Sequence, residues 1–303
     1  MSFSCRPVTQ AARSEPTGYS ARVTTPTTRV SVGDVVAALD ALYPPETAEE
    51  WDAVGLVCGD RGDLVRRVLF AVDPAPDVVD EALAWDADVL VTHHPLLLRG
   101  VHGVATDSWK GRAIHRLIRG GCALFTAHTN ADVARGGVND ALADALGLYD
   151  VRELTDTESG VGLGRIGRLD VESTLGRLAE RVASVLPSTP AGVRVLGPLD
   201  RHVRDVAVCG GAGDSLLADV VASGADAFVT ADLRHHPASE HLASSGPGLI
   251  DAGHWATEWP WLPVAATALV EALEVRGIGA ATVETRVSTL VTDPVTGWFS
   301  SGE

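Results

Sequence analysis

The stretch ADVLVTHHPL, residues 87–96, predicts the fold most directly. It reads as an apolar strand that ends in two histidines and Pro95. A second strand candidate lies at residues 67–72 and a helix is predicted near residues 77–85. A strand, a helix and a strand within about 30 residues are typical of a βαβ unit with a right-handed crossover. Because such units form parallel sheets that are buried on both faces, we predict an α/β protein.

The same unit recurs 138 positions later in the chain. Aligning residues 65–92 with residues 203–230 without gaps gives eight identities in 28 positions. A histidine pair follows each copy, at residues 93–94 and at residues 235–236. Ligand sites in open α/β sheets lie beyond the carboxyl ends of the strands, and both pairs fall there. We therefore predict two related α/β lobes.

This repeat divides the chain into four predicted segments. The N-terminal segment is rich in Ser, Thr, Pro and Arg and has no apolar core like that of a secretory leader. A transit peptide has a similar composition, but we expect a disordered tail or an over-long start. In chain order, the four segments are the disordered tail, the first lobe, a connecting segment, and the second lobe with a C-terminal strand: residues 1–29, 30–150, 151–200 and 201–303.

The composition predicts a soluble, cytoplasmic protein. Hydrophobic residues make up 46% of the chain, but no apolar run approaches the roughly 20 residues that a membrane helix needs. A net charge of −16 argues against nucleic acid as a partner, because such proteins carry clustered positive charge. The four cysteines, Cys5, Cys58, Cys122 and Cys209, are far apart and form no C-x-x-C pair, which favours reduced thiols. We therefore expect neither a nucleic-acid nor a membrane partner.

Three groups of histidines and carboxylates follow predicted strands. They lie at residues 93–94, at residues 128–132 (HTNAD) and at residues 254–258 (HWATE). In the third group the imidazole and the carboxylate are four residues apart, which places them on one face of a helix. The groups contain five metal-ligand candidates and one further histidine: His93, His94, Asp132, His254, Glu258 and His128.

Each group alone also has an ordinary structural interpretation. Neighbours in a regular strand point to opposite faces, so His93 and His94 reach one site only if the chain turns, as Pro95 favours. Asp132 alone reads as a turn or capping residue, and the third group alone reads as a surface contact. Three such groups at strand ends of a repeated framework together favour a shared metal site.

Histidines combined with carboxylates suit Zn, Mn, Fe, Co or Ni, whereas Ca and Mg prefer oxygen ligands. Five ligands are too many for one open catalytic ion and suit two divalent metal ions that share a bridging group. Paired ions about 3.5–4 Å apart can lower the pKa of a bridging water and hold the oxyanion of a hydrolytic transition state. The residues alone therefore indicate that two-metal hydrolysis is chemically feasible.

A glycine-rich stretch, Gly211-Ala-Gly213, resembles the start of a dinucleotide-binding fingerprint. The third glycine is absent, because Leu216 stands in its place, so we do not predict a nucleotide site from it. An anion at the following helix N-terminus remains an alternative.

The chain as a whole resembles the Nif-three-like family, whose bacterial members are often named GTP cyclohydrolase 1 type 2 homologues. Five stretches carry the resemblance: EWDAVGL at 50–56, ADVLVTHHPL at 87–96, AHTNAD at 127–132, ADAFVTADLRHH at 225–236 and DAGHWATE at 251–258. The chain departs from the family pattern at Ala53, Ala231 and His235, while His236 matches it. None of the departures is a ligand, so they bear on substrate contacts more than on metal binding.

The resemblance implies that the metal ligands are the same five residues: His93, His94, Asp132, His254 and Glu258. It also implies two α/β lobes of the Nif-three-like fold, a dinuclear metal site in the cleft between them, and a ring-shaped homohexamer. Our first hypothesis is a metal-dependent hydrolase acting on a nucleotide-like or other small substrate, such as GTP, with His128 or His236 in proton transfer. The second is a non-enzymatic metal-binding or metal-handling hexamer that serves as a scaffold or regulatory partner.

Overall fold

The computed structural model describes residue 1 and residues 29–155, 161–279 and 282–299. The predicted disordered tail, residues 1–29, therefore lies almost wholly outside the described residues.

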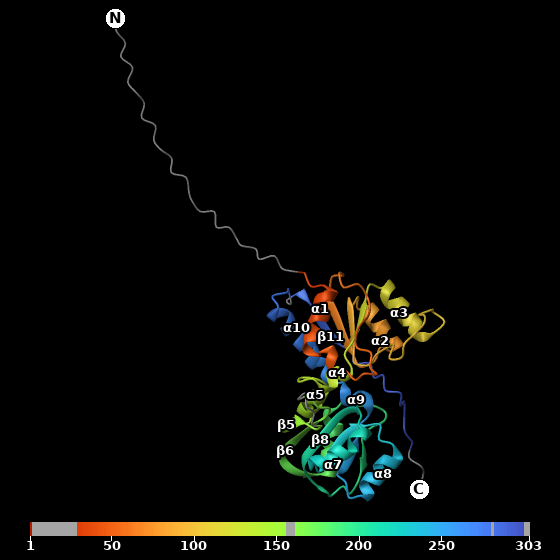
Figure 1. The fold of residues 1–303 in the computed structure, drawn as a ribbon, viewed down its shortest axis with the longest axis vertical. Helices are drawn as coiled ribbons and strands as arrows, with labels where there is room; N and C mark the ends of the chain where they lie inside the picture. Colours follow the sequence, from red (N-terminus) through yellow and green to blue (C-terminus); the bar gives the residue numbers. More distant parts are fainter. Residues whose placement is uncertain (2–28, 156–160, 280–281, 300–303) are drawn as a thin grey trace.

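The described residues form two sheets, one above the other in Figure 1. The first has the strand order β1-β4-β3-β2-β11: Gly55–Cys58, Ala123–Thr126, Val89–Thr92, Arg67–Ala71 and Glu284–Val287. The second has the order β5-β6-β8-β9-β10-β7: Tyr149–Glu153, Arg165–Thr174, His202–Ala212, Ala227–Ala231, Gly248–Asp251 and Arg194–Leu196. Each sheet has a parallel centre, β4-β3-β2-β11 in the first and β8-β9-β10 in the second. The predicted α/β fold is confirmed.

Helices surround the two sheets and fill the space between them (Figure 1). Around the first sheet lie α1, α2, α3 and α10: Val32–Leu42, Pro76–Ala84, Trp109–Arg119 and Trp261–Val275. Near the junction lie α4, α5 and α9: Thr129–Val133, Val138–Ala145 and His254–Glu258. Around the second sheet lie α6, α7 and α8: Leu175–Val185, Leu217–Ser223 and His235–Ala243.

The first helix begins where the sequence predicts. Ser31 Oγ accepts a hydrogen bond from the Asp34 backbone N–H at 3.2 Å, and the Asp34 carboxylate accepts one from the Ser31 backbone N–H at 2.8 Å. This capping box satisfies two donors that the first helical turn leaves free.

The sequence repeat is also a structural repeat, β2-α2-β3 and β8-α7-β9. Asp88 Oδ2 accepts hydrogen bonds from the backbone N–H groups of Arg66 and Arg67 at 2.7 and 3.0 Å. Asp226, which the repeat aligns with Asp88, accepts the two aligned N–H groups at 2.9 Å each. In both lobes a carboxylate before one parallel strand therefore holds the start of its neighbour.

Two segments join the sheets differently from the predicted division of the chain. Residues 151–200, expected to connect the lobes, supply β6 and β7 of the second sheet. The C-terminal strand β11, assigned to the second lobe, instead pairs in parallel with β2 of the first sheet. Helix α10 packs against α1, so the chain has already returned to the first lobe before β11. Which edge a short strand joins depends on these distant contacts.

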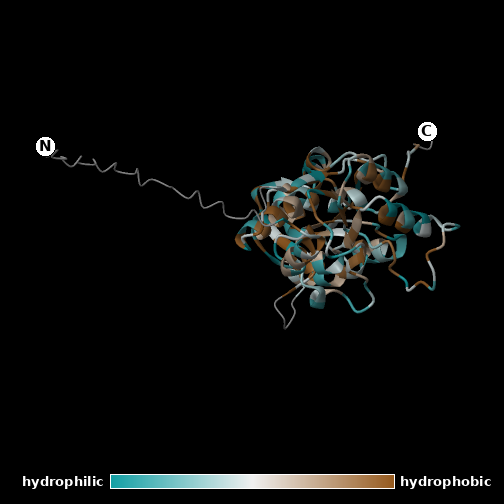
Figure 2. Cartoon of the chain, turned by 90° about the horizontal axis from the view of Figure 1, so that it is seen from above, coloured by the Kyte–Doolittle hydropathy of each residue, from teal (hydrophilic) through white to brown (hydrophobic). Residues whose placement is uncertain are grey.

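The interior is apolar and the outer helix faces are more hydrophilic, as Figure 2 shows. The buried strands β3, β4 and β9 explain the continuous apolar runs in the sequence. None of the helices in the described part of the chain is long and apolar enough to cross a membrane.

Candidate metal centre

The candidate ligands are carried by the ends of three parallel strands. His93 and His94 follow β3, α4 with Asp132 follows β4, and α9 begins after β10. The strands β3 and β4 belong to the first sheet and β10 to the second. Each lobe therefore contributes some of the candidate ligands. The structure brings all five predicted ligands together: His93, His94, Asp132, His254 and Glu258.

Two histidines from different lobes face each other across Glu258. His94 Nε2 and His254 Nε2 are 3.2 Å apart. Glu258 Oε2 lies 3.1 Å from the first of these nitrogens and Oε1 lies 2.9 Å from the second. One ligand atom from each of these three residues lies close enough to the others to hold one metal ion.

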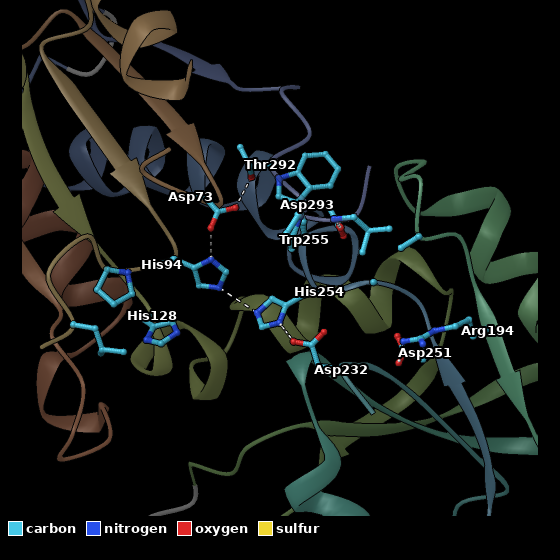
Figure 3. A pocket seen from close by; sticks show the side chains of 16 residues that line it. Asp73, His94, His128, Arg194, Asp232, Asp251, His254, Trp255, Thr292 and Asp293 are labelled. Carbon is cyan, nitrogen blue, oxygen red and sulfur yellow. Dashed lines mark hydrogen bonds and ion pairs between the residues drawn. The ribbon is translucent and has the colours of Figure 1, made fainter. Parts of the chain in front are cut away.

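The other nitrogen of each imidazole is hydrogen-bonded to a carboxylate (Figure 3). His94 Nδ1 lies 2.7 Å from Asp73 Oδ1, and His254 Nδ1 lies 2.7 Å from Asp232 Oδ2. A neutral imidazole that donates its Nδ1 proton to a carboxylate presents the lone pair of Nε2 to a metal. Both rings are therefore oriented as metal ligands.

A second set of ligand atoms is buried without hydrogen-bond partners. His93 Nδ1 lies 2.9 Å from the Ala127 carbonyl oxygen, so it must be the donor, and Nε2 is left to point at the carboxylates. This Nε2 lies 3.6 Å from Asp132 Oδ1 and 3.5 Å from Glu258 Oε1. His93 Nε2, Asp132 Oδ1 and Glu258 Oε2 are buried with no hydrogen-bond partner among the described residues. The last atom is close to His94 Nε2, but outside hydrogen-bonding geometry.

Unpaired buried polar atoms are costly, each by about 1–3 kcal/mol. Three of them converging from two lobes need a common partner. A divalent cation is a suitable partner because it accepts lone pairs from both imidazole and carboxylate. The donor set therefore fits a metal.

The ionisable side chains of the cluster shift the pKa values of one another. Burial opposes the charged form of His94, but the Glu258 charge and the hydrogen bond with Asp73 outweigh it and raise the pKa of His94 to about 10. Burial likewise opposes the charged form of His254, yet Glu258 and Asp232 raise the pKa of His254 to about 11. The positive charges of these imidazoles outweigh burial at Glu258 and hold the pKa of its carboxyl well below the usual range. The carboxylates of the cluster therefore favour positive charge at the positions of the imidazoles.

His128 belongs to the same cluster. Its ring lies 5.1 Å from the ring of His93 and 5.6 Å from that of His94, centroid to centroid. Ligand atoms of these three histidines form a second group able to hold a metal ion. His128 Nδ1 lies 2.8 Å from Asp52 Oδ1, and Asp52 Oδ2 accepts hydrogen bonds from the Thr129 backbone N–H and hydroxyl. Burial disfavours the Asp52 carboxylate, but these hydrogen bonds outweigh it and lower its pKa.

The carboxylates that hold the imidazoles were not predicted as site residues. Asp52 lies 76 residues before His128, and no spacing in the sequence links them. Asp73 and Asp232 each follow a parallel strand, β2 and β9, at its carboxyl end. That position is the signal by which they could have been found.

The structure does not bring His236 to the cluster. It is exposed on the first turn of α8, where its ring contacts that of His235 at a centroid distance of 5.2 Å. The residue that the repeat aligns with His94 is Asp232, which reaches His254 directly. The second histidine pair of the repeat is therefore displaced along the chain into a helix.

A cavity of about 450 Å³ opens beside the cluster (Figure 3). His94, His128 and His254 line it, so three imidazoles are accessible to a small molecule. Residues 292–295, from the segment after β11, form another wall. The Thr292 hydroxyl donates a hydrogen bond to Asp73 Oδ2, which connects this wall to the carboxylate that holds His94.

The glycine-rich stretch at the end of β8 packs closely against neighbouring side chains. Gly211 has a φ of +66°, and a Cβ there would lie 2.4 Å from Glu258 Oε1 and 3.0 Å from His254 Nε2. A Cβ at Gly213 would lie 2.2 Å from the Thr230 hydroxyl oxygen. Gly211 is explained by the approach of the backbone to the candidate ligands, and Gly213 by its close contact with Thr230. Neither glycine requires a bound nucleotide.

The fold and the site together define a two-sheet α/β protein with histidine and glutamate side chains able to hold a metal ion. The chain belongs to the Duf34/NIF3 (NGG1p interacting factor 3) family, whose model matches residues 30–294. The family expected from the sequence is thus confirmed.

Known relatives resemble this chain over most of its length. A Streptomyces coelicolor protein called GTP cyclohydrolase 1 type 2 homolog is 52% identical over 274 residues, covering 89% of this chain and 95% of the relative. A Mycobacterium bovis protein of the same name is 37% identical and covers 88% of this chain and 96% of its own length. Among solved structures, a Bacillus cereus protein related to NIF3 matches with a TM-score of 0.80 and 27% identity, covering 88% of this chain and 99% of that one.

Proposed function

We propose that the protein binds two divalent transition-metal ions, Zn, Fe, Mn, Co or Ni, through His93, His94, Asp132, His254 and Glu258. The observation that carries this proposal is the convergence of buried, unpaired ligand atoms from both lobes. Glu258 supports a two-ion centre, because its two oxygens approach His93, His94 and His254 from one side chain. A carboxylate in this position would supply an oxygen ligand beside each of these histidines.

We further propose that the protein is a metal-dependent hydrolase. When bound, two such ions would lower the pKa of a water molecule and stabilise negative charge that develops on a substrate oxygen. Among the candidates for proton transfer, His128 lines the cavity and is held by Asp52, whereas His236 does not line it. We therefore assign proton transfer to His128, at the nitrogen that faces the cluster.

The proposed substrate is a nucleotide-like or other small molecule. The cavity volume of about 450 Å³ lies within the range of small-molecule sites. GTP is one candidate, because the name of the Streptomyces and Mycobacterium relatives refers to GTP cyclohydrolase.

The test is a screen of metal-reconstituted protein against GTP, other nucleotides and phosphoesters. We expect turnover that is lost in Asp132→Ala and in chelator-treated protein. His115→Ala is the matched control, since His115 lies on α3, away from the cluster, and this variant should keep full activity. Stoichiometric metal binding without turnover of any substrate would favour the metal-handling alternative. Loss of turnover in the control as well would contradict the assigned site.

A further inference from the structure

Among the described residues that line the cavity beside the candidate metal centre, Arg194 is the one arginine or lysine. Arg194 lies on β7, directly across from Asp251 in the antiparallel pairing with β10. Asp251 is the last residue of β10, and the chain then continues to His254 in α9. The strand pairing therefore places the guanidinium at the end of the strand that leads to the metal centre.

The guanidinium is anchored by one of its donors. Arg194 Nη2 donates to Asp251 Oδ2 at 2.6 Å, and the same oxygen accepts the Leu233 backbone N–H at 3.1 Å. The Asp251 side chain is only 4% exposed, whereas that of Arg194 is 66% exposed. A guanidinium has five N–H donors. Among the described residues, Asp251 is the acceptor that hydrogen-bonds to this guanidinium. The remaining donors are free to bind a ligand.

The four carboxylates that line the cavity each have a partner already. Asp73 is bound to His94, Asp232 to His254 and Asp251 to Arg194. The carboxylate of Asp293 accepts the Val295 backbone N–H at 2.8 Å. An anionic group that enters the cavity could therefore accept hydrogen bonds from the unused N–H donors of Arg194.

We propose that Arg194 forms an anion subsite, which binds a phosphate or carboxylate group of the substrate at the end remote from His94. Figure 3 shows Arg194 and Asp251 on one side of His254 and His94 on the other. A ligand that spans the cavity would thus contact the metal centre with one end and the guanidinium with the other. The substrate class is a small organic phosphate or carboxylate. This inference rests on the proposed metal centre.

If Arg194 had only a structural role, its substitution would not change the preference for an anionic ligand. The test therefore needs a variant that folds and a matched control. Its pair with Asp251 crosses two neighbouring strands and is largely exposed on the arginine side. The amide of Arg194→Gln keeps N–H donors for Asp251, and the Leu233 backbone N–H still donates to that carboxylate, so the variant should fold. Arg234 is a matched control because it is also an exposed arginine, paired with Asp214, but it does not line the cavity.

The experiment uses hydroxamates, which bind metal ions at one end and carry a variable tail at the other. Calorimetry on the zinc-reconstituted full chain would compare ω-carboxylate and ω-phosphonate hydroxamates with their uncharged carboxamide analogues, over a series of spacer lengths. We expect the best charged ligand to bind at least about tenfold more tightly than its uncharged analogue. Arg194→Gln should abolish this advantage, Arg194→Lys should retain part of it, and Arg234→Gln should leave it unchanged.

The outcomes separate the two proposals. If charged and uncharged ligands bind the wild-type protein equally, the anion subsite is wrong and the metal centre stands. If no hydroxamate binds, the metal centre fails and the subsite fails with it. An equal loss of the advantage in Arg234→Gln would show a general charge effect and overturn the assignment to Arg194. The better of the two tails identifies the anionic group as phosphate or carboxylate.

Discussion

At the scale of single residues, three imidazoles of the cluster have the same environment. Each has one nitrogen bound to a carboxylate and the other turned toward its neighbours: His94 with Asp73, His128 with Asp52, and His254 with Asp232. Such carboxylates select the tautomer and the orientation of a ligand ring. The geometry around the candidate centre is therefore determined by aspartates as much as by the ligands themselves.

The ligand set predicts how metal content responds to substitution. The wild-type protein should carry close to two transition-metal ions per chain by elemental analysis. Glu258→Ala removes the side chain that approaches three histidines, so we expect loss of at least one ion with the fold retained by circular dichroism. His102→Ala, in an exposed loop, should keep full occupancy. One ion or none in the reconstituted wild-type protein would contradict the two-ion proposal.

Substituting an aspartate that orients an imidazole should reduce metal affinity less than the removal of a candidate ligand does. Asp73→Asn keeps the shape of the side chain but removes the charge that holds His94. We expect metal affinity to fall by about 10- to 100-fold, measured by competition with a chromogenic chelator. Asp77→Asn, in the first turn of α2 and away from the cluster, should leave the affinity unchanged. Unaltered affinity in Asp73→Asn would show that the carboxylate does not support the ligand.

At the scale of elements, strand ends decide both the fold and the site. The candidate ligands follow the carboxyl ends of β3, β4 and β10, and Asp73 and Asp232 follow those of β2 and β9. The segment after β11 runs down from the first lobe along the second (Figure 1). Through Thr292 and Asp293 it approaches Asp73 and Gly253, so it contacts both lobes beside the cavity.

The two aspartates of the repeat predict a matched pair of stability effects. Asp226→Ala leaves two backbone N–H groups at the start of β8 without their acceptor. We expect a loss of about 1–3 kcal/mol, seen in thermal unfolding as a lower Tm. Asp88→Ala should have a similar effect in the first lobe, whereas Asp219→Ala, a first-turn residue of α7, should cost less. A negligible effect in both repeat variants would show that water replaces these carboxylates.

At the scale of the whole molecule, the site exists only where the two lobes meet. His93 and His94 belong to the first lobe, while His254 and Glu258 follow a strand of the second sheet. Neither sheet alone supplies a complete ligand set. Any change in how the lobes pack would therefore alter the candidate metal centre.

We also propose, from the family resemblance, that the protein assembles as a closed homohexamer. With a net charge of −16, non-specific association is disfavoured, so an oligomer requires a specific and symmetric interface. Six chains of 31.6 kDa give about 190 kDa. Light scattering at micromolar concentration should report that mass, and should report the same mass at high salt. A mass of one chain, 31.6 kDa, would refute the hexamer.

The candidate ligands and the repeated βαβ units could be predicted from the amino-acid sequence. Both depend on local patterns: apolar runs of strand length, a helical i,i+4 spacing, and histidines placed directly after strands. The cap at Ser31 and the helix that follows it are equally local. The family resemblance was carried by the same stretches, because they combine strand ends with ligand candidates.

Only the tertiary structure decided which distant residues meet. Asp52 is paired with His128, and Asp232 with His254. His236 lies on α8, away from the cluster, and β11 pairs with β2. These outcomes depend on how the two sheets pack against each other. A local pattern determines whether a segment forms a strand or a helix, because neighbouring residues set its hydrogen bonds and apolar face. Contacts between the lobes depend on long-range packing, which no local spacing in the sequence encodes.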